Sequence, residues 1–218
     1  MASDVTYSSY LDLERILAAQ HPASEAHDEM LFIIVHQASE LWLKLCLHEL
    51  TKARACIRAD DLRPSLKMLA RVARAQGQLI QSWDVLSTMT PHDYSTIRPH
   101  LGGSSGFQSA QYRMMEFLLG GRNPDMITMH EATPEVADGL RAELTRKSIY
   151  AEAIALLARH FATVTADRAD DDSLRFACSR RMAELERFPA LLTLAVRGVA
   201  HDPIAKERFH ADGRKAMR

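Results

Sequence analysis

Apolar residues recur at intervals of three and four along most of this 218-residue chain, which is the period of an α-helix. Alternating patterns typical of strands never extend beyond a few residues, and no internal repeat or Gly/Ser linker divides the chain. The pattern therefore predicts an all-α fold, a helical bundle forming a single domain over residues 1–218. The expected helices cover, in chain order, 7–17, 28–58, 64–89, a short helix between Thr90 and Pro99, then 107–121, 133–143, 147–161, 172–187, 189–199 and 203–216.

The segment 28–58 is apolar nearly all round, which predicts the central helix of the bundle. Its neighbour, 64–89, instead carries its apolar residues on one face. Thr90, Pro91 and Asp93 then fit the N-cap, first-turn proline and first-turn acid of a new helix. This short helix should end before Pro99 and the glycine- and serine-rich loop that follows.

The net charge of the chain argues against nucleic acid or a membrane surface as its binding partner. The formal charge is −1, so the chain lacks the basic surplus that binding to nucleic acid or to a membrane surface uses. Its N-terminal residues have no signal-peptide pattern, and uninterrupted apolar runs are shorter than a bilayer span, so a cytoplasmic location is expected. Cys46, Cys56 and Cys178 have neither disulfide-framework nor zinc-site spacing and are predicted to be reduced thiols.

His36 lies in the middle of the apolar segment FIIVHQASELW. Burying a titratable ring is costly unless it is paired or used. Phe32 precedes it by one helical turn, and Glu40 follows by one turn as a candidate hydrogen-bond partner. From these residues alone, His36 is either a satisfied core histidine or a functional group.

Tyr94 and Arg98 are also four residues apart, immediately before the loop Leu101–Gly106. The guanidinium fork matches a carboxylate, and the loop offers backbone amides and hydroxyls to an anionic group. The alternative is an arginine stacked on a tyrosine at the surface, followed by an ordinary connector.

Three segments in this order resemble the haem-dependent tryptophan 2,3-dioxygenase family. They are TYSSYLDLERILAAQHP, HDEMLFIIVHQASELWLKLCLHEL and LSTMTPHDYSTIRPHLGGSSGFQSAQYRMMEFLLG, and the resemblance is nearly continuous over residues 6–124. Residues 125–218 depart from the family and are interpreted as a shortened, divergent helical tail. The resemblance implies an all-helical homotetramer that binds haem b. It also implies insertion of both atoms of O₂ across the indole C2–C3 bond of L-tryptophan, giving N-formylkynurenine, in tryptophan catabolism by the kynurenine pathway.

The resemblance also implies roles for individual residues. His36 matches the catalytic-site histidine that hydrogen-bonds the indole N–H, and Phe32 matches the aromatic packed against the indole. Arg98, helped by Tyr94, matches the clamp on the substrate carboxylate. Further matches are Ser105 near haem and substrate, Trp83 beside the porphyrin, and Tyr7, Tyr10 and Leu11, which complete the substrate pocket of a neighbouring subunit.

Two family features are missing from the sequence. No tryptophan follows Trp83, so the helix bearing the proximal haem histidine is not found, and no GTGG loop occurs. His201 and His210 are the remaining candidates for an axial haem ligand, and neither has the expected surroundings. The chain is accordingly a shortened dioxygenase, a divergent relative that oxidises an indolic amino acid differently, or a relative that has lost haem catalysis.

Two other functional classes fit less well. A structural or interaction module would not need the combination of His36 and Arg98. A zinc or di-iron helical enzyme needs paired His and Glu ligands at helical spacing, and Glu116 has no histidine three residues away.

Overall fold

The computed structural model describes the backbone of residues 5–166 and the side chains of residues 5–160. Within that range the chain forms helices and no strand, as the apolar periodicity predicts. The elements are α1 (Tyr7–Leu11), α2 (Leu13–Leu17), α3 (Glu29–Arg58), α4 (Leu62–Leu86), α5 (Pro91–Ile97), η1 (Arg98–Leu101), η2 (Gly106–Gln108), α6 (Ala110–Leu119), η3 (Pro124–His130), α7 (Pro134–Thr145) and α8 (Ile149–Ala166).

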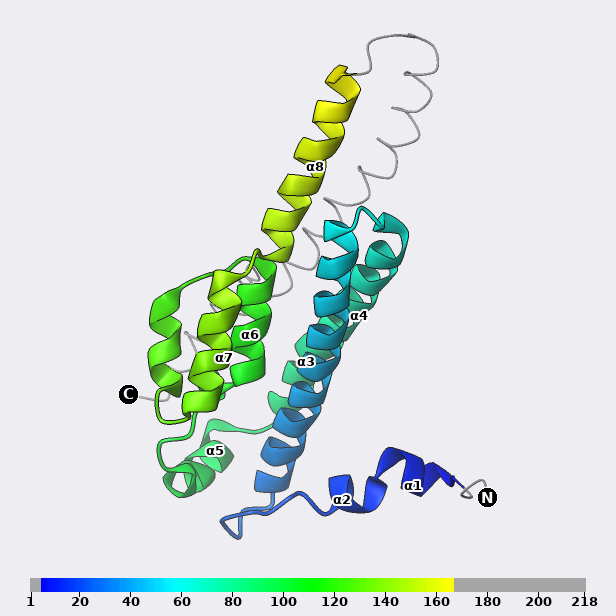
Figure 1. Ribbon diagram of the computed structural model, residues 1–218. Coiled ribbons are helices and arrows are strands. Elements are labelled where there is room, and N and C mark those ends of the chain that lie inside the picture. Colours follow the sequence, from blue (N-terminus) through cyan, green and yellow to red (C-terminus); the bar gives the residue numbers. More distant parts are fainter. Residues whose placement is uncertain (1–4, 167–218) are drawn as a thin grey trace.

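Helices α3 and α4 form a long antiparallel hairpin that is the backbone of the fold (Figure 1). The turn between them passes through Asp60 in the left-handed conformation, with φ of 59°. Buried residues on both helices are spaced alternately by three and four, which is the pattern of a coiled-coil seam. The seam consists of Leu43, Cys46, Leu50, Ala53 and Ile57 on α3 and of Leu62, Ser65, Leu69, Val72 and Gln76 on α4.

Helices α6, α7 and α8 cover one side of this hairpin (Figure 1). Residues on one face of α6, including Met115 and Leu118, join the hairpin core together with Ile149 and Leu156 of α8. The opposite face of α6 presents Phe117 to η3 and α7, where a second core cluster forms with Ile127, Ala137 and Leu140. The bundle thus has two connected apolar layers on either side of α6.

Buried ion pairs fix α3 to the C-terminal helices. Arg54 of α3 binds both carboxylate oxygens of Glu143 on α7 and donates to the Lys147 carbonyl oxygen at 3.2 Å. One turn further on, Arg58 binds Glu152 of α8 at 2.7 Å. Both glutamates are buried, so these ion pairs compensate charges that water does not reach; Arg146 adds a second contact to Glu143 at 3.6 Å.

Several predicted helix boundaries are correct. Helix α3 matches 28–58, α4 approximates 64–89, and α7 and α8 match 133–143 and 147–161. Thr90 caps α5 with a full capping box to Asp93, as the sequence indicates.

Two predicted helices are wrong in detail. The segment 7–17 is divided at Asp12, which has φ of 50° and caps α1. Both halves are exposed, so no core packing holds them as one helix. The segment 107–121 is likewise divided, because the Ser109 side chain accepts from the Tyr112 amide and is the N-cap of α6.

Element η3 was not predicted, and the expected helices 172–187, 189–199 and 203–216 lie outside the described residues.

Helix α3 is buried mainly in its C-terminal half. Ile34, Leu41 and Trp42 in its N-terminal half are exposed, so the prediction of a fully central helix is only partly correct. By length and composition α3 is also apolar enough to cross a membrane, contrary to the sequence expectation. The core helix of a soluble protein meets the same criterion, and the seam residues of α3 do pack against α4.

The thiols of Cys46 and Cys56 are free and buried, as predicted, whereas Cys178 lies outside the described residues. Burial raises the pKa of Cys46 to about 11, and Glu49 adds to the shift. This thiol is therefore an unreactive core group.

Candidate active site

His36 lies on the second turn of α3, and a hydrogen bond within the helix fixes its ring. Its Nδ1 is 2.7 Å from the backbone carbonyl oxygen of Phe32. A carbonyl oxygen can only accept, so Nδ1 must carry the hydrogen. In the neutral imidazole Nε2 is then the unprotonated nitrogen and a hydrogen-bond acceptor. The helix itself selects this tautomer.

Aromatic rings connect α3 to α5 beside this histidine. The centroids of Phe32 and His36 are 4.2 Å apart with the rings tilted by 37°, and Phe32 and Tyr94 are 6.2 Å apart with a tilt of 38°. Tyr94 remains 39% exposed. Phe32 is therefore the middle ring of a row of three, and Tyr94 is its outer end.

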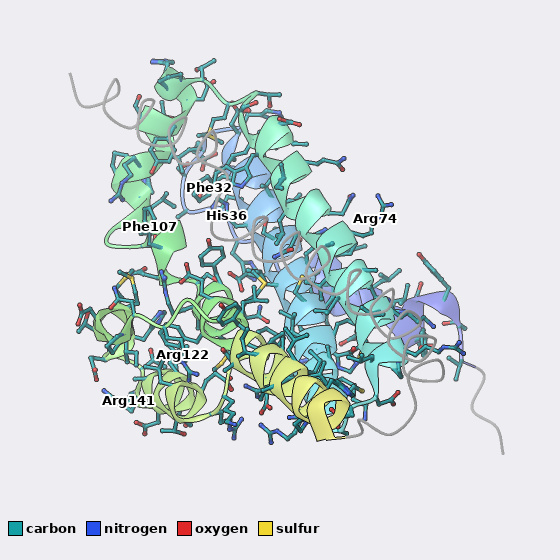
Figure 2. The ribbon with its side chains drawn as sticks, turned by 90° about the horizontal axis from the view of Figure 1, so that it is seen from above. Phe32, His36, Arg74, Phe107, Arg122 and Arg141 are labelled. Carbon is teal, nitrogen blue, oxygen red and sulfur yellow. The ribbon has the colours of Figure 1, made fainter. Side chains whose placement is uncertain are left out.

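The loop after η1 reaches the other side of His36. Gly106 has no Cβ, and a Cβ built on it would lie 3.9 Å from His36 Nε2. The backbone here is held by a capping box: the Phe107 amide donates to Ser105 Oγ at 3.3 Å, and the Ser105 amide donates to Gln108 Oε1 at 3.1 Å. Figure 2 shows Phe32 and His36 together on α3, with Phe107 of this loop across from them.

Arg98 stands at the junction of α5 and η1, close to the same loop. Its guanidinium donates to the Gly102 carbonyl oxygen at 2.7 Å, and the side chain is exposed. No cation–π contact with Tyr94 is found among the described residues, so the stacked-pair alternative is not supported. Arg98 is exposed to solvent and binds its own loop, so its role as a carboxylate clamp stays a prediction.

Glu40 does not bind His36, which corrects the other contact suggested by spacing. Its carboxylate accepts from Gln111 Nε2 of α6 at 2.7 Å. The same amide nitrogen also donates to the Glu40 backbone carbonyl at 2.9 Å. Glu40 therefore joins α3 to α6, and His36 is oriented by Phe32 instead.

Glu29 is a buried group near the site that the sequence did not reveal. At the start of α3 its carboxylate accepts from the amides of Ala23 and Ser24 at 2.8 and 2.7 Å and from the Ser24 hydroxyl at 2.5 Å. The Ser24 hydroxyl, followed by the Ala23 amide, lowers the Glu29 pKa below its usual value. His100 of η1 also contributes to this shift, so the α5–η1 corner lies near the start of α3.

The remaining predicted site residues lie at the end of the α3–α4 hairpin and on α1. Trp83, on the last turn of α4, is at the same end of the hairpin as His36 and is 51% exposed. Tyr7, Tyr10 and Leu11 lie on α1, which projects from the base of α3 on the side away from α5 (Figure 1). Both tyrosines are more than three-quarters exposed, and neither joins the His36 site of its own chain.

The side chains that could bind a metal ion do not cluster in the described part of the chain. Within residues 5–166 no group of three or more His, Cys, Asp or Glu side chains could hold a metal ion, and Glu116 pairs with Arg113. His160 lies 4.0 Å from Asp60 at the opposite end of the hairpin, and His201 and His210 lie outside the described residues. A metal site built from three or more protein side chains is therefore not found among the described residues. A haem iron differs, because it needs a single axial protein ligand.

Comparison with known proteins agrees with this arrangement. The family model for tryptophan 2,3-dioxygenase matches residues 1–165. Tryptophan 2,3-dioxygenase of Erythrobacter litoralis is 82% identical over 159 residues, which are 73% of this chain and 60% of that protein. Tryptophan 2,3-dioxygenase 1 of Ralstonia nicotianae is 53% identical over 171 residues, 78% of this chain and 58% of that protein. The chain thus spans about 60% of the length of these curated relatives. It belongs to the tryptophan 2,3-dioxygenase family.

Proposed function

We propose that this chain takes part in opening the indole C2–C3 bond of L-tryptophan with O₂ to give N-formylkynurenine, in the kynurenine pathway of tryptophan catabolism. The observation that carries this proposal is the tautomer of His36. Its Nδ1 hydrogen is committed to the Phe32 carbonyl, which leaves Nε2 as an acceptor suited to an indole N–H.

His36 acts by orientation. An indole N–H is a weak acid, so accepting its hydrogen bond positions the ring and removes no proton from it. Phe32 lies against the imidazole and offers its ring to the indole, and Tyr94 extends the aromatic row toward solvent. A planar bicyclic ligand fits this row better than an aliphatic one.

Arg98 is proposed to bind the substrate carboxylate. Its guanidinium already donates to the Gly102 carbonyl. Five N–H donors allow it to keep that contact while a second edge binds a carboxylate, or to exchange the carbonyl for the carboxylate. Either way, substrate binding and the position of the Leu101–Gly106 loop are linked through one side chain.

Haem b is the proposed cofactor, because the family is haem-dependent in general. When bound, haem supplies the activation of O₂, and the protein supplies position and exclusion of water. Trp83 and Ser105 would border the porphyrin. The iron ligand is proposed to lie outside residues 5–166, where His201 and His210 are candidates.

The chain is proposed to work as a cytoplasmic homo-oligomer, a tetramer, with no nucleic-acid or membrane partner. Support comes from α1, a short, capped helix that lies away from the bundle (Figure 1) and carries the exposed Tyr7 and Tyr10. Large exposed aromatic side chains of this kind are typical of surfaces that contact another subunit. Together with Leu11 they would complete a neighbour's pocket.

One alternative is favoured by a specific observation. No GTGG loop occurs in this sequence. The alternative is a divergent relative that binds an indolic amino acid but performs another oxidation or has lost haem catalysis.

An absorption titration separates these functions. The purified chain is supplemented with haem, L-tryptophan is added, and product is followed under air. The proposal predicts a Soret band that shifts with L-tryptophan and formation of N-formylkynurenine. L-tryptophan binding by calorimetry without a haem spectrum or product would favour the alternative, and no binding at all would contradict both.

A further inference from the structure

A Cβ built on Gly106 would lie 3.9 Å from His36 Nε2, and the backbone of Gly106 does not explain why it is glycine. Its φ is outside the left-handed range, and nothing but His36 lies within 4 Å of a Cβ built there. Gly102 in the same loop differs, because its φ of 55° favours glycine directly. An alanine at position 106 would therefore fold without strain or clash.

We propose that Gly106 is a specificity-determining residue: the missing side chain keeps open the space through which a ring N–H donor reaches His36 Nε2. The inference deepens the proposed function and rests on it. It explains a glycine that neither conformation nor packing requires.

The size of a methyl group determines from which directions a hydrogen-bond donor can still reach His36 Nε2. A donor nitrogen must approach Nε2 to about 2.9 Å, and it cannot come closer than about 3.5 Å to a methyl carbon. With a Cβ at 3.9 Å from Nε2, donors are excluded from directions within roughly 60° of the line joining Nε2 to that carbon. The methyl would thus remove the donor directions on the Gly106 side of Nε2 while making only an ordinary van der Waals contact with the imidazole.

Hydrogen bonds on both sides set the distance between Gly106 and His36. The capping box of Ser105 and Gln108 spans Gly106, and Gln108 Nε2 also donates to the Gly103 carbonyl oxygen at 3.4 Å. The imidazole is held by the Phe32 carbonyl through Nδ1. A methyl added at Gly106 therefore lies beside Nε2 as long as these hydrogen bonds persist.

The test is calorimetric titration of L-tryptophan and of 1-methyl-L-tryptophan, which lacks the ring N–H, into the full chain and its variants. Gly106→Ala should weaken L-tryptophan binding roughly two- to twelve-fold, the loss of one neutral hydrogen bond. It should also reduce the preference for L-tryptophan over the methylated ligand. Gly77→Ala on α4 is the control for adding a methyl group away from the site, since a Cβ there meets nothing within 4 Å and affinity should not change.

A double variant distinguishes obstruction of His36 from general damage to the loop. In the His36→Ala background, Gly106→Ala should have little further effect on L-tryptophan affinity. Wild-type affinity and preference in Gly106→Ala would overturn this inference while leaving the proposed function intact. Absence of L-tryptophan binding by the unmodified chain would overturn the proposed function and this inference together.

Discussion

Replacing Arg98 with Ala should weaken L-tryptophan binding, and the structure sets how much. A hydrogen bond to a charged group contributes about 1.5–3 kcal/mol, whereas a fully exposed ion pair contributes only about 0–1 kcal/mol. Arg98 is exposed and already donates to Gly102, so the expected loss lies between these limits, at about 1–2 kcal/mol. That loss corresponds to roughly a five- to thirty-fold weaker affinity.

Calorimetric titration with two ligands measures how much the substrate carboxylate contributes to binding. Tryptamine has the indole and amine of L-tryptophan without the carboxylate, so its affinity should be nearly unchanged by Arg98→Ala. Arg98→Lys should recover only part of the loss, because an ammonium cannot form the two parallel hydrogen bonds of a guanidinium. His36→Ala should be less damaging than Arg98→Ala, since it removes one neutral hydrogen bond.

Two outcomes would refute the carboxylate clamp. The first is an Arg98→Ala chain that binds L-tryptophan as tightly as wild type. The second is an equal loss for tryptamine, which would mean that Arg98 acts by holding the Gly102 loop and not by binding substrate.

Three further predictions concern stability, measured by denaturant unfolding. Gln76→Leu should raise the free energy of unfolding by about 1–2 kcal/mol. The reason is that the Gln76 amide in the seam is 3% exposed and has no hydrogen-bond partner among the described residues. A decrease in the free energy of unfolding would contradict the placement of Gln76 in the seam. Arg54→Met should lower the free energy of unfolding by at most about 3–5 kcal/mol, since the buried Glu143 would keep only its 3.6 Å contact with the exposed Arg146, whereas the half-exposed Arg141→Met should change it little. The pKa of Glu29 is lowered by its Ser24 and Ala23 hydrogen bonds, so its stabilising effect is complete above its usual value of 4.5 and is lost as pH falls further. Unfolding followed against pH should show a smaller acid destabilisation in Glu29→Gln than in wild type, and identical profiles would refute this role.

Much of the fold follows from local sequence rules. The recurrence of apolar residues at three and four predicts helices at α3 and α4, and Thr90, Pro91 and Asp93 predict the start of α5. These features were predictable because each depends on residues within a few turns of one another. The division of 7–17 at Asp12 was not, because the apolar pattern continues across a residue that has a left-handed φ.

The residues of the candidate site come from the family resemblance and remain proposals, and helical spacing predicts only some of their contacts. Helical spacing placed Phe32 beside His36 correctly, but it suggested Glu40 as a partner, and Glu40 instead binds Gln111, 71 residues away. Contacts of this kind depend on tertiary packing and leave no local signal. Gly106 could have been noticed only as a glycine in a loop, since its nearness to His36 joins residues 70 positions apart in the sequence.

The acceptor role of His36 Nε2 is tested most directly by nitrogen NMR of the chain labelled with ¹⁵N-histidine, with His36→Ala used to assign the signal. The account predicts that free His36 is the neutral tautomer protonated at Nδ1. It predicts further that L-tryptophan shifts its Nε2 resonance as an accepted hydrogen bond does, whereas 1-methyl-L-tryptophan does not. A ring protonated at Nε2, or an Nε2 resonance unmoved by saturating L-tryptophan, would contradict the account.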